Sequence, residues 1–139
     1  MKAVYVGRHQ LLPLQEQALA QLGLSIAKRI ENLPAEPAAL NALLSELQAT
    51  GVEAIVTVAL PPHLLAQLSS KFPLYVFEMK SVLFQTQEEA EKWAAQAPEK
   101  RTYLPGRQGE PVRGLEFVGV NKVRVVVEST RVWPQSASQ

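Results

Sequence analysis

Two short segments of the chain combine residue types that could do chemistry. His9 follows Gly7 and Arg8, and His63, the other histidine of the chain, follows a pair of prolines. Imidazole titrates near neutral pH, so a histidine can act as general acid, general base or metal ligand. A guanidinium group binds phosphate or carboxylate through its planar fork of donors. These two segments therefore predict an anion site or a site of acid–base chemistry.

Charged side chains near two other apolar segments extend this set. Glu78 and Lys80 follow the apolar run 74–77, and Glu31 follows the run 24–30. If these runs are parallel strands, their carboxyl ends meet at one edge of a sheet, which is where open α/β sheets bind ligands. We predict that the ligand-binding residues at this edge are Gly7, Arg8, His9, His63, Glu78 and Lys80.

Two further interpretations of this edge stay open. His9 and His63 with Glu78 would form a two-histidine, one-carboxylate metal set, but three separate loops would have to converge, so we expect no metal and no cofactor. The same residues also suit plain structural roles. Arg8 could form a surface ion pair with Glu31 or Glu78, and His63 could face solvent in the first turn of a helix.

The apolar pattern predicts the elements that would position these residues. The runs 3–6 and 54–60 are apolar on both faces, which is typical of central strands in a parallel sheet, whereas 24–30 is half polar and suits an edge. A helical pattern follows each of these three runs, and the helix after 54–60 is short. We predict a small three-layer flavodoxin/Rossmann-like α/β domain with a parallel sheet of order 2-1-3-4. In that order the loops of His9 and His63 flank the switch point.

The C-terminal part has a different pattern. Thr86 is placed to cap a helix from Gln87 to about Ala97, and short strands are expected at 101–104 and 114–118. A strong final strand is predicted at Val123–Glu128, followed by a disordered tail over 134–139. The sequence leaves open whether 81–84 prolongs the fourth strand. We therefore expect one domain over residues 1–133, with a parallel core over 1–80 and a helix plus an antiparallel β extension over 81–133.

This extension offers a second functional hypothesis. Basic residues interleaved with aromatic ones suit a nucleic-acid backbone with stacked bases. The competing interpretation is that exposed cations protect strand edges from aggregation. The apolar strand at 123–127 would also favour pairing with a second copy in a homodimer. The nucleic-acid hypothesis depends on Arg101, Arg107, Arg113 and Arg124.

Composition narrows the class of protein. The 139 residues are 47% hydrophobic, contain no cysteine and carry a formal charge of +1. Disulfide frameworks and thiolate chemistry are therefore excluded, and no net field attracts nucleic acid or membranes. The apolar N-terminal run ends at Gly7, which is too short for a secretory signal, and no run approaches the ~20 residues of a membrane span. We expect a cytoplasmic protein.

Familiar catalytic signatures are missing from the sequence. There is no glycine-rich dinucleotide fingerprint, no phosphate-binding P-loop and no nucleophile elbow. Our leading hypothesis is a small ligand-binding or regulatory domain that holds an anionic or nucleotide-like ligand at the edge described above. The second is a nucleic-acid or protein interaction module. The third is a small hydrolase or nuclease with His9 or His63 as its acid–base group.

Overall fold

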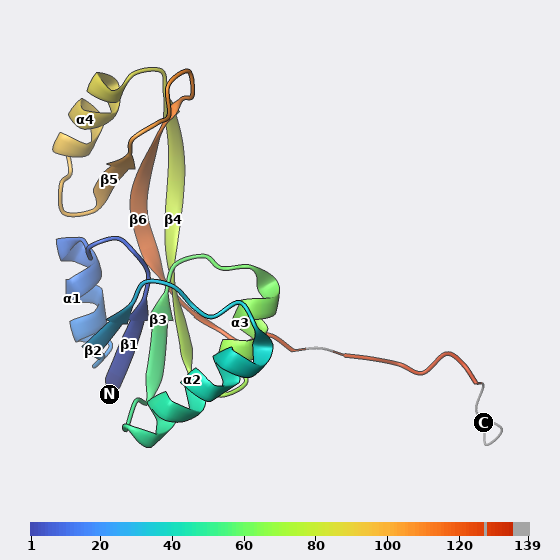
Figure 1. Ribbon diagram of the computed structural model, residues 1–139. Coiled ribbons are helices and arrows are strands. Elements are labelled where there is room, and N and C mark those ends of the chain that lie inside the picture. The colour runs from blue at the N-terminus through green and yellow to red at the C-terminus, as the bar shows by residue number, and fades with distance from the viewer. Residues whose placement is uncertain (127, 135–139) are drawn as a thin grey trace.

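The computed structural model describes residues 1–126 and 128–134, which form four helices and one six-stranded sheet (Figure 1). The sheet order is β2-β1-β3-β4-β6-β5. Its strands are β1 Lys2–Val6, β2 Ser25–Ile30, β3 Ala54–Thr57, β4 Leu74–Phe84, β5 Arg101–Leu104 and β6 Val112–Val123. The helices are α1 Pro13–Gln21, α2 Pro37–Ala49, α3 Pro62–Ser69 and α4 Gln87–Ala95.

The first four strands confirm the predicted fold class and strand order. β1 pairs in parallel with β2 and β3, and β3 pairs in parallel with β4. The central strands β1 and β3 are apolar on both faces because helices cover both, and Val4 and Ile55 are fully buried. β2 lies at the edge, and most of its residues are exposed. The helices α1, α2 and α3 connect these parallel strands in turn, as the alternation of strand and helix patterns in the sequence predicted.

Two core layers lie on opposite faces of the parallel sheet. On one face, Leu44 of α2 and Leu68 of α3 pack in the same cluster as Ile55. On the other face, Leu19 of α1 packs in a cluster with Tyr5, and that cluster also contains aromatic residues of β4 and β6. The parallel core is thus a three-layer arrangement of helix, sheet and helix.

The strand β4 continues past the parallel core into an antiparallel extension. It pairs with β6 from Leu74 opposite Val123 to Phe84 opposite Val112, so the segment 81–84 prolongs the fourth strand. The ladder is irregular between Glu78 and Met79, where the core and the extension meet. β5 pairs with the outer edge of β6, and α4 lies beside β5 (Figure 1).

Side chains from α4 pack closely on one face of this extension. The ring centroids of Trp93 and Phe84 are 5.4 Å apart, and the Arg101 guanidinium lies 4.6 Å from the centroid of the Trp93 ring. Arg101 Nε also donates to Glu116 at 2.8 Å. These contacts fix α4 on the face of the extension that carries Phe84, Arg101 and Glu116.

The final strand was predicted at the wrong place. The strand β6 ends at Val123, and Arg124–Val126 and Glu128 are not in a strand; Val127 lies outside the described residues. The reason is that Val123 pairs with Leu74, the first residue of β4, so β4 has no residue left to pair with those after Val123. The predicted strand at 114–118 is the middle of β6. The predicted disordered tail falls on residues 135–139, outside the described residues, except for Pro134.

The four helices formed by the described residues are all too short or too polar to cross a lipid bilayer.

Candidate functional site

Arg8 stands at the carboxyl end of β1, where the sheet order reverses between β1 and β3. Its Nε and Nη2 both donate to the Asn32 side-chain oxygen, at 3.2 and 2.6 Å. The nearby carboxylate of Glu31 is bound by Arg29, with Nη2 and Oε1 2.8 Å apart. Within the described part of the chain, no carboxylate lies within ion-pair distance of Arg8. The guanidinium is therefore held in place by a neutral amide and keeps its charge uncompensated.

A cavity of about 320 Å³ opens beside Arg8, and we call it the switch-point cavity. It lies on the side of the sheet that α3 covers, because Leu64 of that helix contributes to its wall. Its polar part comes from the loops that follow β1 and β2. The residues that matter here are Gly7, Arg8, His9, Glu31, Asn32 and Leu64.

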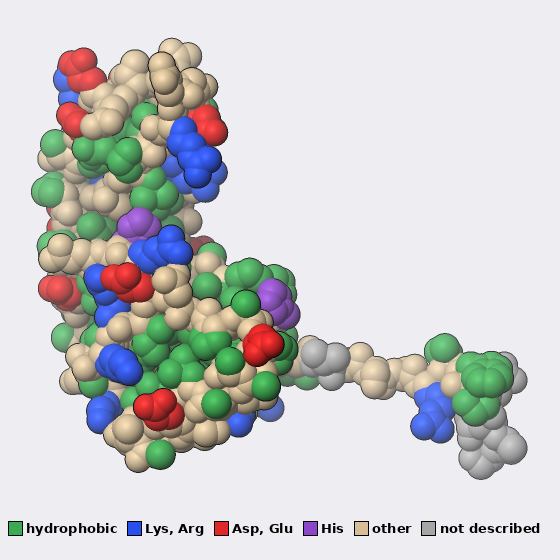
Figure 2. All heavy atoms as spheres, in the orientation of Figure 1, with side chains coloured by type: hydrophobic (Ala, Val, Ile, Leu, Met, Phe, Trp, Pro, Cys, Tyr) green, Lys and Arg blue, Asp and Glu red, His purple; other side chains and the backbone are tan. Residues whose placement is uncertain are grey.

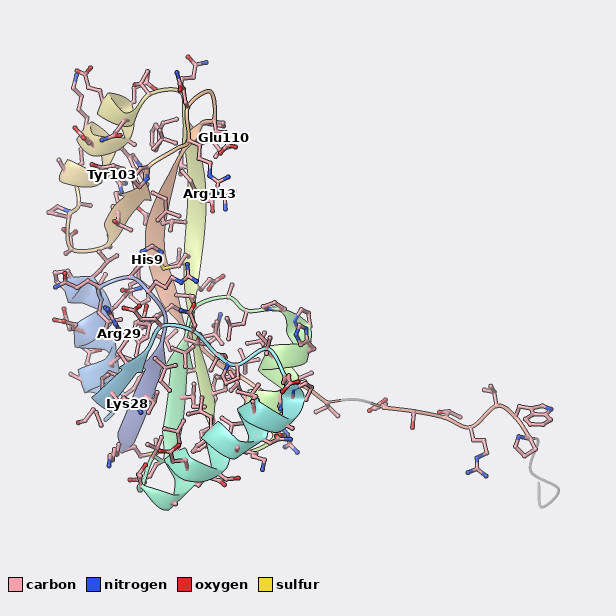
Figure 3. The ribbon with its side chains drawn as sticks, viewed as in Figure 1. His9, Lys28, Arg29, Tyr103, Glu110 and Arg113 are labelled. Carbon is pink, nitrogen blue, oxygen red and sulfur yellow. The ribbon has the colours of Figure 1, made fainter. Side chains whose placement is uncertain are left out.

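A second cavity, of about 400 Å³, lies between the parallel core and the extension, and we call it the junction cavity. Its walls come from β1, α1, β4, β5 and β6, and include Tyr5, Gln15, Phe77, Thr102 and Arg113. His9 lines this cavity as well as the switch-point cavity. Figure 3 shows His9 at the level where the core meets the extension, with Arg113 farther out along the extension.

The buried Tyr5 side chain brings a hydroxyl group to the junction cavity. Tyr5 is 3% exposed, and its ring makes an edge-to-face contact with Phe77 at a centroid distance of 6.1 Å. Burial raises the pKa of the Tyr5 hydroxyl, against a smaller lowering by the positive charge of Arg29. No hydrogen bond among the described residues involves this hydroxyl, and none of their buried side-chain oxygen atoms lacks a partner, so the Tyr5 oxygen itself is accessible. It is thus a neutral donor and acceptor facing the cavity.

Gln15 is the second buried polar residue at this cavity, with 5% exposure. Its Oε1 accepts from the backbone NH of Leu12 at 2.8 Å, at the start of α1. Its Nε2 lies 3.6 Å from the sulfur of Met79, a weak acceptor. The amide is therefore fixed through Oε1, and its Nε2 group can still donate a hydrogen bond to a ligand.

The structure brings together only part of the predicted site. Gly7, Arg8 and His9 lie together at the switch point, as their position in the sequence suggested. His63 is exposed in the first turn of α3 and lines neither cavity. Figure 2 shows the two histidines as separate patches. An acid–base role for His9 or His63 stays a prediction.

Glu78 and Lys80 lie inside β4 because that strand runs on to Phe84. Residues alternate between the two faces of a strand. Since Met79 and Ser81 line the junction cavity, Glu78 and Lys80 point to the opposite face. There, the Glu78 carboxylate accepts from the Asn121 amide at 3.5 Å, and Lys80 stands across from Glu116. Arg8 pairs with neither of the carboxylates considered for it, and the described residues contain no group of three metal-ligating side chains.

The arginines of the extension are dispersed. Arg101 is held by Glu116 and by the backbone oxygen of Trp93 at 3.0 Å, on the face covered by α4. Arg113 lies on the other face, in the junction cavity. Arg107 lies in the loop between β5 and β6, and Arg124 follows the far end of β6. The nucleic-acid hypothesis stays a prediction, and these four side chains do not share one surface.

Sequence reasoning missed the junction cavity, and of its residues it named only His9 and Arg113, for other sites. Tyr5 and Phe77 have the pattern of ordinary core residues, and Thr102 that of an ordinary strand residue. Only Tyr5 gave a signal, because a phenol inside a run of alanine and valine needs a partner for its hydroxyl. The cavity itself depends on how far β4 and β6 project beyond the core, which no local pattern encodes.

Comparison with models of protein families, with curated proteins and with solved structures finds no match for this chain.

Proposed function

We propose that this chain is a small ligand-binding domain that holds an anionic molecule over the carboxyl ends of β1 and β3, with Arg8 as the anion-binding group. The observation that carries the proposal is the pairing of Arg8 with Asn32. An arginine paired with a carboxylate is neutralised, whereas one oriented by an amide keeps its full charge for a ligand.

The geometry of that pairing leaves donors free for an anion. Nε and Nη2 are engaged by one oxygen atom of Asn32, so the edge formed by Nη1 and Nη2 keeps unpaired N–H groups. That edge suits two oxygens of a phosphate or carboxylate. Gly7, which precedes Arg8, adds no side chain that would obstruct the approach.

The dimensions of the two cavities support a small molecule as the ligand. Their volumes of about 320 and 400 Å³ lie within the range of roughly 300–1,000 Å³ typical of such sites. Both open at the carboxyl edge of the parallel strands, which is where ligands bind in folds of this class.

Thermal denaturation in the presence of anions tests the proposal. Inorganic phosphate, sugar phosphates and nucleotides are each added in millimolar amounts to the wild type and to Arg8→Gln, Asn32→Ala and Arg131→Gln. A ligand at ~100 times its Kd stabilises a protein by about 2.7 kcal/mol, which is easily measured as a rise in Tm. We expect at least one anion to raise the Tm of the wild type and of Arg131→Gln, which removes an arginine outside both cavities.

The same anion should fail to stabilise Arg8→Gln. It should stabilise Asn32→Ala only weakly, because that variant keeps the charge of Arg8 but loses its orientation. An equal rise in Tm for Arg8→Gln and the wild type would refute the proposal. So would the absence of any rise with the wild type across the whole panel.

A further inference from the structure

We infer that the ligand is a phosphorylated nucleoside whose phosphate meets Arg8 in the switch-point cavity while its base occupies the junction cavity. The inference rests on the proposed function and adds the identity of the uncharged part of the ligand. It also gives the antiparallel extension a role, as one wall of the site.

The two cavities adjoin each other across the ends of β1 and β3. His9, after β1, and Val58, after β3, each line both of them. The switch-point cavity lies toward α3 and the junction cavity toward the face of Tyr5 and Phe77. One molecule lying over Val58 and beside His9 would therefore reach into both cavities.

The chemistry of the junction cavity differs from that of its neighbour. Met79, Leu104 and Leu115 provide a half-buried apolar wall, and the Tyr5 and Phe77 rings lie buried behind it. A nucleobase has two apolar faces and a polar edge, so it gains by burying a face against such a wall. An inorganic anion or a bare sugar phosphate would leave this apolar surface unused.

Polar groups around the same cavity suit the edge of a base. No hydrogen bond among the described residues involves the Tyr5 hydroxyl, and none of their buried side-chain oxygen atoms lacks a partner, so the Tyr5 oxygen is accessible from the cavity as a donor and acceptor. The Gln15 amide and the Thr102 hydroxyl add further groups at other points of the wall. Arg113 brings guanidinium donors that suit carbonyl and ring-nitrogen acceptors on a base edge.

The extension supplies this part of the wall by strand alternation. Arg101 of β5 points to Trp93 on the face covered by α4, so Thr102 points to the opposite face, into the cavity. Arg113 reaches the cavity from β6 in the same way. The extension thus presents polar groups to the ligand on the face that α4 leaves open.

Isothermal titration of the full chain distinguishes the two compartments. The probes are inorganic phosphate, ribose 5-phosphate, the four common ribonucleosides and their 5′-monophosphates. The variants are Arg8→Gln for the phosphate and Tyr5→Phe for the base. Tyr103→Phe is the matched control, because that hydroxyl donates to Glu91 at 3.1 Å on the side of α4.

We expect at least one nucleoside monophosphate to bind at least tenfold more tightly than both ribose 5-phosphate and its own nucleoside. Arg8→Gln should weaken that nucleotide at least tenfold and leave the nucleoside unchanged. Tyr5→Phe should weaken the nucleotide and the nucleoside by about fivefold, the effect of one lost hydrogen bond, and leave ribose 5-phosphate unchanged. Tyr103→Phe should bind every probe like the wild type.

Failure of the inference is distinguishable from failure of the proposed function. If ribose 5-phosphate or phosphate binds as tightly as every nucleotide, and Arg8→Gln abolishes that binding, the anion site stands and the base compartment is wrong. If no probe binds the wild type, both are wrong. A Tyr5→Phe protein that binds nucleotides normally would also overturn the inference, and its Tm without ligand shows that it is folded.

Discussion

The hydroxyl of Tyr5 lies directly against Gly7, so that a Cβ atom added to residue 7 would come within 2.5 Å of the Tyr5 oxygen. The ring atoms Cε1 and Cζ would each be 2.7 Å away. The tyrosine ring therefore folds back under the end of its own strand and occupies the space that a side chain at residue 7 would need. A side chain at residue 7 would therefore displace Tyr5, which lines the junction cavity.

Gly7→Ala should accordingly destabilise the protein. The Tyr5 ring is buried against Phe77, so it cannot move without disturbing the core, and overpacking of this kind costs about 1–3 kcal/mol. The free energy of unfolding in urea measures the loss. Gly119→Ala is the control, since nothing lies within 4 Å of a Cβ at residue 119. A Gly7→Ala protein as stable as the control would show that the ring adjusts freely.

Glu116 should make the stability of the protein dependent on acid pH. The hydrogen bond from Arg101 holds the pKa of this carboxyl below its usual value of 4.5, with a smaller opposing effect of burial. Folding therefore favours the carboxylate. Its stabilising contribution is complete above the pKa of the unfolded chain and is lost as the pH falls through the lowered pKa of the folded one.

Replacement of the carboxyl checks this dependence. In Glu116→Gln the free energy of unfolding should decrease less between about pH 6 and about pH 3 than it does in the wild type. Glu88→Gln is the comparison, because Glu88 is exposed and pairs with Lys92 on the surface of α4. Equal acid sensitivity in all three proteins would contradict the role assigned to Glu116.

Thr86 caps the helix α4, as the sequence predicted. Its hydroxyl oxygen accepts from the backbone NH of Glu89 at 3.2 Å. Thr86→Ala should lower the free energy of unfolding by about 0.5–2 kcal/mol, because that NH loses its partner at the start of the helix. Thr86→Ser keeps the hydroxyl and should retain most of the stability. If both variants lose stability to the same extent, the cap is not the cause.

The parallel core could be predicted because its signals are local. The run 54–57 is apolar on both faces and rich in β-branched residues, and it forms the buried strand β3. The half-polar run 25–30 forms the edge strand β2. Gly23 has φ +73° just after α1, in the left-handed conformation expected for a residue that ends a helix. Each of these features is decided by a few neighbouring residues.

The antiparallel extension could be predicted only in outline, because pairing between distant strands decides it. The run 123–127 has strong β propensity, yet β6 stops at Val123 because β4 offers no further partner. For the same reason the sequence could not decide that β4 continues to Phe84. The candidate site likewise combines residues placed by local sequence with residues placed by distant strand pairing. Arg8 and His9 follow from the end of a local strand, whereas Arg113 reaches the cavity through a partner far away in the chain.

The continuity of β4 and β6 has a consequence for how a ligand would be captured. Proteins that close around a ligand bend at a hinge of a few residues that absorb large backbone changes. Here two hydrogen-bonded strands cross from the core into the extension, and Phe117 of β6 packs against Phe77 of β4 at a centroid distance of 5.5 Å. The pairing continues on both sides of the irregularity at Glu78 and Met79, so we expect the walls of the junction cavity to keep their spacing when a ligand binds. Selectivity would then come from the fixed width of the cavity, and binding would cost little conformational entropy.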